Sequence, residues 1–259
     1  MVGIFGKIMN ATEKLARADY GIDAPGVVRG FAVAGISAMA LGAVSYIWLG
    51  AVQPGIALGL FIAGVVIAIG CLATVGEMLW SSRVGKLHAR DLMLRSIPWR
   101  GDEWVLDVGC GRGMLLIAAA KHLTRGKAIG IDLWSSSDQS DNRPESTWAN
   151  AHAEGVAEQI QVRDGDARKL SFPDKTFNVI FSSLTLHHLR DPRERVQAVR
   201  EMARVLKPGG RIALLDVRYT DEYAHALSEC GLVSVRRSRP MLLFFSPVAR
   251  VVLAKKPVV

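Results

Sequence analysis

A long apolar stretch without charge dominates the first third of the chain. No charged residue occurs between Arg29 and Glu77, and Gln53-Pro54-Gly55 near its middle is a typical turn sequence. The segments on either side of this turn are each longer than the roughly 20 apolar residues that a helix needs to cross a bilayer. The pattern predicts a transmembrane helical hairpin over residues 30–76.

Small residues recur at every fourth position in both halves of this hairpin. They are Gly30, Ala34, Ala38 and Gly42 in the first half and Gly55, Gly59 and Ala63 in the second. Because small residues let helix backbones approach closely in lipid, we expect these positions to form the helix contact. A buried hairpin in a soluble oligomer is the alternative, whereas the polar segment 1–29 ahead of two long runs disfavours a signal peptide.

Basic residues flank the hairpin on both sides. They are Lys7, Lys14, Arg17 and Arg29 before it and Arg83, Lys86, Arg90, Arg95 and Arg100 after it, with none in the turn. The positive-inside rule predicts a multi-pass membrane protein with residues 1–29 and everything after the hairpin on the cytoplasmic side. Residues 77–100 form an amphipathic linker, which lies on the anionic leaflet surface or packs as a helix on the following domain.

Short apolar runs alternate with helical stretches from residue 101 onward. The runs are Trp104–Asp107, Ala128–Asp132, Ile160–Arg163, Phe177–Phe181 and Arg211–Val217. Two basic strands are expected near the C-terminus, Val233–Arg239 and Ala249–Lys256. This alternation predicts an α/β domain over residues 101–259, with a parallel sheet covered by helices on both faces. In such sheets ligands bind at the carboxyl ends of the strands, so the site is expected in the loops that follow them.

Composition narrows the classes of protein. Half of the residues are hydrophobic, mean hydropathy is +0.22 and the formal net charge is +8. The basic excess is shared between both parts of the chain rather than gathered into a stripe, so no nucleic-acid partner is expected. Cys71, Cys110 and Cys230 stand far apart, which predicts neither a disulfide framework nor a metal site.

The first predicted strand runs into a glycine-rich loop, VLDVGCGRG at residues 105–113. Gly109, Gly111 and Gly113 allow a sharp turn and a close approach of a ligand to the backbone. Met114 stands where a dinucleotide-binding fingerprint requires glycine, and the Lys-Ser/Thr pair of a P-loop is missing. The loop resembles instead the first motif of class I S-adenosylmethionine-dependent methyltransferases, with Asp107 two positions before the first glycine.

The resemblance continues through AIGID ending at Asp132, the triplet 165–167, FNVIFSSLTLHHL at 177–189 and RVLKPGGRIALLD at 204–216. It implies a Rossmann-like seven-stranded sheet and S-adenosyl-L-methionine as cofactor. By this resemblance, Asp132 would accept hydrogen bonds from the ribose hydroxyls of the cofactor and Asp166 one from its adenine amine. Asp107 would help to hold the amino-acid end of the cofactor. The implied cofactor-binding residues are Asp107, Gly109, Gly111, Asp132, Leu133, Asp166, Ala167 and Ser182.

Two histidines, His187 and His188, follow the fourth predicted strand, where the acceptor would lie. Histidine changes charge near neutral pH, so one of them could act as the base that removes a proton from the acceptor. The alternative is that they only orient the cofactor or fill the wall. Adjacent histidines without a third ligand make poor zinc spacing, so no metal is expected.

The acceptor class follows from a missing motif and from the hairpin. Ser182-Ser183-Leu184-Thr185 stands where DNA and protein-amide methyltransferases have an Asn/Asp-Pro-Pro-aromatic sequence, and this chain lacks that sequence. The resemblance therefore implies a small-molecule or lipid acceptor, and a membrane anchor favours a lipophilic one. A tethered enzyme for a soluble metabolite or protein, and a non-catalytic membrane sensor of S-adenosylmethionine, are the alternatives.

Two further segments leave alternatives open. The polar loop at 134–147 is either a lid over the cofactor or a plain surface loop. The apolar connection at 240–247 is expected to dip into the bilayer or to line the acceptor pocket.

Overall fold

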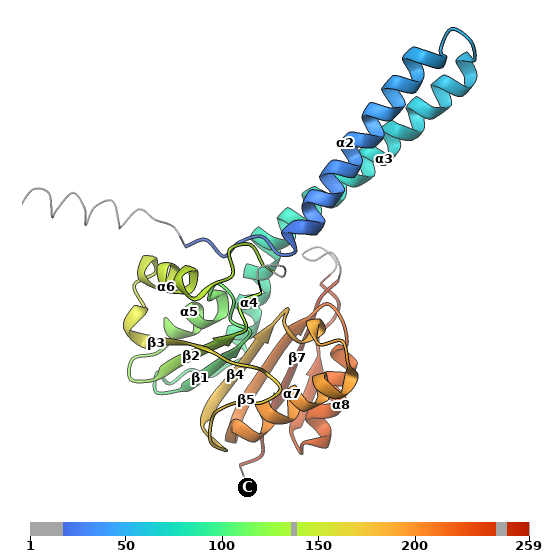
Figure 1. Ribbon diagram of the computed structural model, residues 1–259. Helices are drawn as coiled ribbons and strands as arrows, with labels where there is room; N and C mark the ends of the chain where they lie inside the picture. The colour runs from blue at the N-terminus through green and yellow to red at the C-terminus, as the bar shows by residue number, and fades with distance from the viewer. Residues whose placement is uncertain (1–17, 136–138, 242–247, 259) are drawn as a thin grey trace, which may run out of the picture.

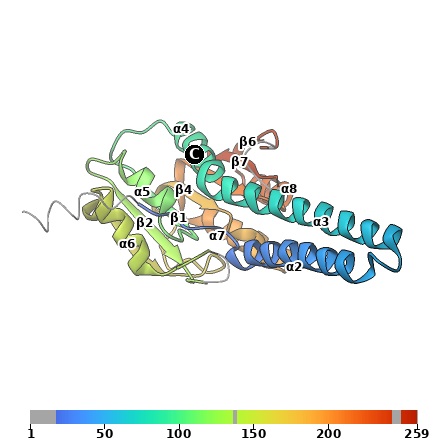
Figure 2. The ribbon, with the colours of Figure 1, turned by 90° about the horizontal axis from the view of Figure 1, so that it is seen from above.

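A computed structural model describes residues 18–135, 139–241 and 248–258 of the protein. Two long helices, α2 (Pro25–Leu49) and α3 (Pro54–Trp80), lie side by side and project from an α/β domain (Figures 1 and 2). Both are long and apolar enough to cross a membrane. They extend beyond the predicted limits of 30–76, since Pro25 is the first residue of α2 and α3 continues to Trp80.

The four-residue pattern selected only some of the residues through which the two helices touch. A Cβ on Gly64, which lies outside the pattern, would be 2.5 Å from the carbonyl oxygen of Ala38, and one on Gly42 would be 3.2 Å from that of Leu60. Gly30, Gly55 and Gly59 of the pattern have nothing within 4 Å on their open side. The predicted stripe is therefore wrong in part. A four-residue step advances about 40° beyond one turn, so such a stripe winds away from the partner helix. A seven-residue step, as from Gly35 to Gly42, stays close to one face.

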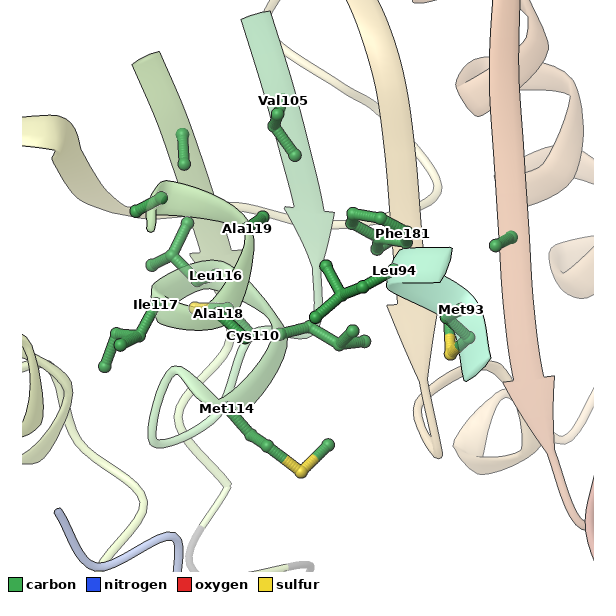
Figure 3. Close-up of a cluster of buried hydrophobic side chains, with 14 of the residues drawn as sticks. Met93, Leu94, Val105, Cys110, Met114, Leu116, Ile117, Ala118, Ala119 and Phe181 are labelled. Carbon is green, nitrogen blue, oxygen red and sulfur yellow. The ribbon is translucent and has the colours of Figure 1, made fainter. Parts of the chain in front are cut away.

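The predicted linker 77–100 is helical and packs on the domain. It comprises the end of α3, a π-helical turn η1 (Ser81–Gly85) and α4 (Lys86–Arg95). Met93 and Leu94 of α4 are buried beside Phe181 and the first helix of the domain (Figure 3). The structure therefore shows α4 packed as a helix on the domain, which is one of the two alternatives for this segment.

The domain is built on a seven-stranded sheet, as the resemblance implied. Its strands are β1 (Trp104–Val108), β2 (Lys127–Asp132), β3 (Ile160–Asp164), β4 (Phe177–Ser183), β5 (Leu206–Asp216), β6 (Val233–Arg237) and β7 (Arg250–Lys255). Their order is β3-β2-β1-β4-β5-β7-β6, and β7 runs antiparallel to both of its neighbours. The order reverses between β1 and β4, which places the carboxyl ends of these two strands beside the crevice where ligands bind in such sheets.

Helices cover both faces of the sheet because side chains alternate along its strands. Val105 faces the core beneath α4 and α5, whereas Leu106 faces the core beneath α7 and α8. The remaining elements are α5 (Met114–Ala120), α6 (Pro144–Ala153), η2 (Ala157–Gln159), η3 (Leu186–His188), α7 (Pro192–Val205) and α8 (Thr220–Glu229). The predicted Rossmann-like α/β architecture with helices on both faces is confirmed.

The predicted loops fall partly outside the described residues. Positions 136–138 of the polar loop and 242–247 of the apolar connection lie there, as do Lys7, Lys14 and Arg17. The sequence Pro208-Gly209-Gly210 lies within β5, where Gly209 has φ 78° and the pairing with β4 shifts register.

Candidate functional site

The glycine-rich loop joins β1 to α5 in a backbone conformation that other residues resist. Gly109, Gly111 and Gly113 have φ values of 73°, 50° and 83°. A Cβ on Gly109 would overlap the side chain of Thr185, and one on Gly111 would meet Gln139. The N–H groups of Gly109 and Cys110 both donate to the carbonyl of Ile131, at 2.8 and 3.0 Å. The loop is thereby pinned to the end of β2.

A mostly apolar cavity of about 360 Å³ opens at the carboxyl ends of the strands. Nine of the predicted site residues line it: Asp107, Gly109, Gly111, Asp132, Leu133, Asp166, Ala167, His187 and His188. Ser182 does not. Its buried hydroxyl donates to the carbonyl of Val108 at 2.8 Å and ties β4 to β1, while the next residue, Ser183, lines the cavity.

Asp132 stands at the end of β2 and organises the loops around it. Its carboxylate accepts the N–H of Gly111 at 2.8 Å and that of Trp134 at 2.7 Å. The Asn142 amide lies within 3.4 Å of the same group. An ionised carboxylate can accept about four hydrogen bonds, so capacity remains for a further donor from the cavity.

Asp107 is completely buried at the end of β1. One carboxylate oxygen accepts the N–H of Leu116 at 2.9 Å, and the other, Oδ1, has no partner within the described structure. Burial raises the pKa of Asp107 to about 7, against the opposing effect of the Leu116 hydrogen bond. A buried hydrogen-bond acceptor without a donor destabilises the folded protein, so we expect a ligand to place a donor or a cation at this oxygen.

Asp166, after β3, is held by a neighbouring cation. Arg168 donates to both of its carboxylate oxygens, at 2.7 to 3.0 Å, and also pairs with Glu194. These hydrogen bonds hold the pKa of Asp166 below its usual range. The carboxylate is therefore a fixed acceptor at the edge of the cavity.

His187 lies on η3 against the buried carboxylate of Asp216, a residue that no sequence motif singled out. Its Nδ1 atom is 2.7 Å from Oδ1 of Asp216, and its backbone N–H donates to Oδ2 of the same residue at 3.1 Å. Tyr223 donates its hydroxyl to Oδ2 as well, and burial beside Asp216 raises the pKa of this phenol, which keeps it protonated. An acidic residue at the end of β5 was the available signal for Asp216.

Residues 19–23, directly before α2, form a strap over the glycine-rich loop. Sequence patterns did not predict this contact. Arg112 donates to the carbonyl and the carboxylate of Asp19, at 2.7 and 2.9 Å. Gln139 donates to the carbonyl of Tyr20 and accepts the N–H of Arg112. The buried Lys86 donates to the carbonyls of Tyr20 and Gly21, at 2.7 and 2.8 Å.

Comparison with known proteins assigns this site to a family. Residues 106–214, less than half of the chain, match the family model described as a methyltransferase domain. This part of the protein is a class I methyltransferase domain, and its cofactor is S-adenosylmethionine. The structure of YcgJ from Bacillus subtilis, 21% identical, shows the same fold with a TM-score of 0.53 over 66% of this chain and 98% of that one.

Curated relatives are similar to the same region. A demethylmenaquinone methyltransferase of Lactiplantibacillus plantarum is 32% identical over 52% of this chain and 54% of its own length. A 27-O-demethylrifamycin SV methyltransferase of Amycolatopsis mediterranei is 32% identical over 49% of this chain and 43% of its own. The chain thus spans about half the length of the curated relatives it matches.

The methyltransferase cavity has features that fit S-adenosylmethionine. The unpaired oxygen of Asp107 suits the ammonium group of an amino acid, because a cation removes the penalty of a buried carboxylate. Gly109 and Gly111 line the cavity at positions where a Cβ would collide with the side chains of Thr185 and Gln139. In the described part of the chain, no group of three or more His, Cys, Asp or Glu residues is arranged to hold a metal ion.

Proposed function

We propose that this protein is a membrane-anchored S-adenosylmethionine-dependent methyltransferase that acts on a small, lipophilic or membrane-associated acceptor. One observation carries the proposal: the exposed apolar hairpin continues through η1 into α4, and α4 is packed in the core beside the cofactor cavity. Anchor and catalytic site therefore form one connected unit rather than two domains on a loose tether.

The surface of the hairpin supports membrane insertion. In the most apolar windows of the two helices, only 11% and 22% of the residues are buried, whereas a core helix of a soluble protein is mostly buried. Large apolar side chains point outward along both helices, among them Ile36, Ile47 and Ile69. The exposed Trp48 and Trp80 lie near opposite ends, where aromatic residues anchor helices at the membrane interface.

The distribution of basic residues supports a cytoplasmic methyltransferase domain. Arg83, Lys86 and Arg90 follow α3 directly, and the connection between α2 and α3 has no basic residue. With both ends of the hairpin on the same side, residues 1–29 lie with the catalytic domain in the cytoplasm.

The acceptor class rests on the relatives and on the cavity. One relative is named for a quinone substrate, demethylmenaquinone, and the other for a rifamycin. The cavity lining is mostly apolar, which suits such small molecules. The site has no Asn/Asp-Pro-Pro-aromatic sequence after Phe181, which disfavours nucleic-acid and protein-amide acceptors.

The protein's own residues position the two reactants. S-adenosylmethionine supplies, when bound, a methyl group on a positively charged sulfur. Asp132 would accept hydrogen bonds from the ribose hydroxyls, Asp166 would accept one from the adenine amine, and Asp107 with the glycine loop would hold the amino-acid end. The rate then depends chiefly on alignment of the acceptor with the methyl group.

His187 removes the proton that the acceptor loses. In methyl transfer to a hydroxyl acceptor, the hydroxyl proton would pass to Nε2 of His187, and the electron pair of the donor's carbon–sulfur bond would leave with sulfur. The buried Asp216 carboxylate, 2.7 Å from Nδ1, would hold the ring in place for this transfer. His188, whose ring centre is 4.0 Å from that of His187, completes this wall of the cavity.

A labelling experiment tests the proposal. Membranes containing the full chain are incubated with methyl-labelled S-adenosylmethionine, and label is counted in the organic, aqueous and precipitated-protein fractions. We expect label in the organic phase that disappears with Asp132→Ala and persists with Asp164→Asn, since Asp164 pairs with Asp132 in the sheet but does not line the cavity. Label only in water or protein contradicts the lipophilic acceptor, and no label despite cofactor binding favours a sensor.

A further inference from the structure

The cavity has a second wall that does not belong to the methyltransferase domain. Ala24, Met78, Ser81 and Ser82 line it together with Asp23 and Lys86, and all six precede the matched region 106–214. Met78 is in the last turn of α3, Ala24 directly precedes α2, and the serines begin the π-helical turn. The base of the hairpin therefore faces the same space as His187.

Polar contacts hold this wall in place. The hydroxyl of Ser82 accepts the N–H of Asp23 at 3.1 Å. Lys86 adds an ion pair to the Asp23 carboxylate at 3.2 Å, besides its bonds to two backbone carbonyls. Burial lowers the pKa of Lys86, and the Asp23 carboxylate opposes this effect. Both hairpin ends are thus fastened to each other where they meet the cavity.

The chemistry of the lining changes along α3. Ser81 and Ser82 are the polar positions nearest the domain, and Met78 follows one turn further up the helix. Beyond Met78 the helix carries the exposed Glu77, and further along its exposed side chains are apolar, as at Leu72 and Ile69. A molecule that leaves the cavity past Met78 meets this apolar surface beyond Glu77.

We propose that the acceptor subsite lies between the base of the hairpin and His187, and that it takes an amphipathic molecule. Its hydroxyl-bearing head group faces His187, and its hydrocarbon chain leaves past Met78 along α3 into the bilayer. This inference rests on the proposed function and adds to it that the hairpin is part of the acceptor site rather than only an anchor.

Photo-crosslinking tests the subsite without requiring turnover. The full chain, in phospholipid nanodiscs with S-adenosylhomocysteine, is irradiated with a 4-alkylphenol that carries a diazirine in its chain, and adducts are mapped by mass spectrometry. We expect adducts at Met78 and Ser81 that excess unlabelled 4-alkylphenol removes. Adducts confined to exposed hairpin residues, or none at the hairpin base, overturn the proposal.

Matched variants separate the subsite from general membrane labelling. Met78→Trp fills the cavity wall and is expected to reduce the adduct at Ser81 at least fivefold, whereas Leu72→Trp, on the exposed surface of the same helix, leaves it unchanged. Unchanged S-adenosylhomocysteine affinity shows that each variant is folded. If Met78→Trp does not fold, Ala24→Phe replaces it, because this substitution narrows the same wall of the cavity. Equal labelling in all variants overturns the proposal. If the phenol crosslinks to Met78 but the methyl-labelling experiment gives no label in the organic phase, the proposed reaction is contradicted and the subsite is not.

Discussion

Nδ1 of His187 lies 2.7 Å from Oδ1 of Asp216. The first residue follows β4 and the second ends β5, so the neighbouring strands bring them together across a separation of 29 residues. The ring N–H is not aligned for a hydrogen bond to the carboxylate, whereas the backbone N–H of His187 donates to Oδ2 of Asp216 at 3.1 Å. Asp216 therefore fixes the position of His187 at the cavity wall.

Replacing Asp216 tests this relationship. We expect Asp216→Asn to lower kcat for methyl transfer by about 10²-fold, the lower end of what a general base contributes, without changing S-adenosylhomocysteine affinity. His187→Gln is expected to have a similar effect. Because the two residues act as one unit, the double variant should be no slower than His187→Gln alone. Multiplying effects in the double variant would show that Asp216 acts apart from His187.

Asp132 is expected to govern cofactor affinity. Hydrogen bonds to a charged group contribute about 1.5–3 kcal/mol each, so Asp132→Asn should weaken S-adenosylhomocysteine binding by about 10- to 100-fold. Isothermal titration calorimetry measures this directly. Asp164→Asn is the matched control at the neighbouring strand end, and equal losses in both variants would place the cofactor elsewhere.

Asp107 should make cofactor binding depend on pH. Its pKa is raised from 3.8 to about 7 by burial, so the folded protein without cofactor loses stability as pH rises from about 4 to about 7. The ammonium group of the cofactor favours the ionised carboxylate, so binding should tighten as pH rises, by up to about tenfold per pH unit below 7.

Asp107→Asn supplies the control for this prediction. The variant should lose the pH dependence of S-adenosylhomocysteine affinity between about pH 5 and 7, and its Tm without cofactor at pH 8 should be at least that of the unaltered protein, because a buried charge is removed. A pH-independent affinity in the unaltered protein would mean that no cation binds at Asp107.

The hairpin contact can be tested with two glycines of the same helix. Gly64→Leu should separate α2 from α3, because its Cβ would lie 2.5 Å from the Ala38 carbonyl oxygen, whereas Gly59→Leu meets nothing within 4 Å. Protease sensitivity of the detergent-solubilised protein should rise for Gly64→Leu only. Equal sensitivity of the two variants would contradict the observed pairing of the helices.

Local pattern was sufficient for the elements and for most of the cofactor side of the site. Apolar runs predicted the first five strands, and the last two were predicted as basic strands. The glycine loop with Asp107 and Asp132 located the cavity, because backbone turns and strand ends depend on residues close in sequence. The same reasoning wrongly placed Ser182 in the cavity lining, since its hydroxyl faces Val108. The direction of a side chain at a strand end depends on the register with the neighbouring strand, which local sequence does not give.

Tertiary structure alone decided which distant residues share the site. Asp216 lies beside His187 only because β4 and β5 pair. The strap at 19–23 covers the glycine loop only because Lys86 and Arg112 donate hydrogen bonds to backbone carbonyls of the strap. The seven-residue spacing that joins the helices was in the sequence, but the choice between it and the four-residue pattern required the partner helix. Sequence by itself determined the elements and the likeness to methyltransferases; packing decided that the hairpin base faces the cavity, since such contacts have no local periodicity.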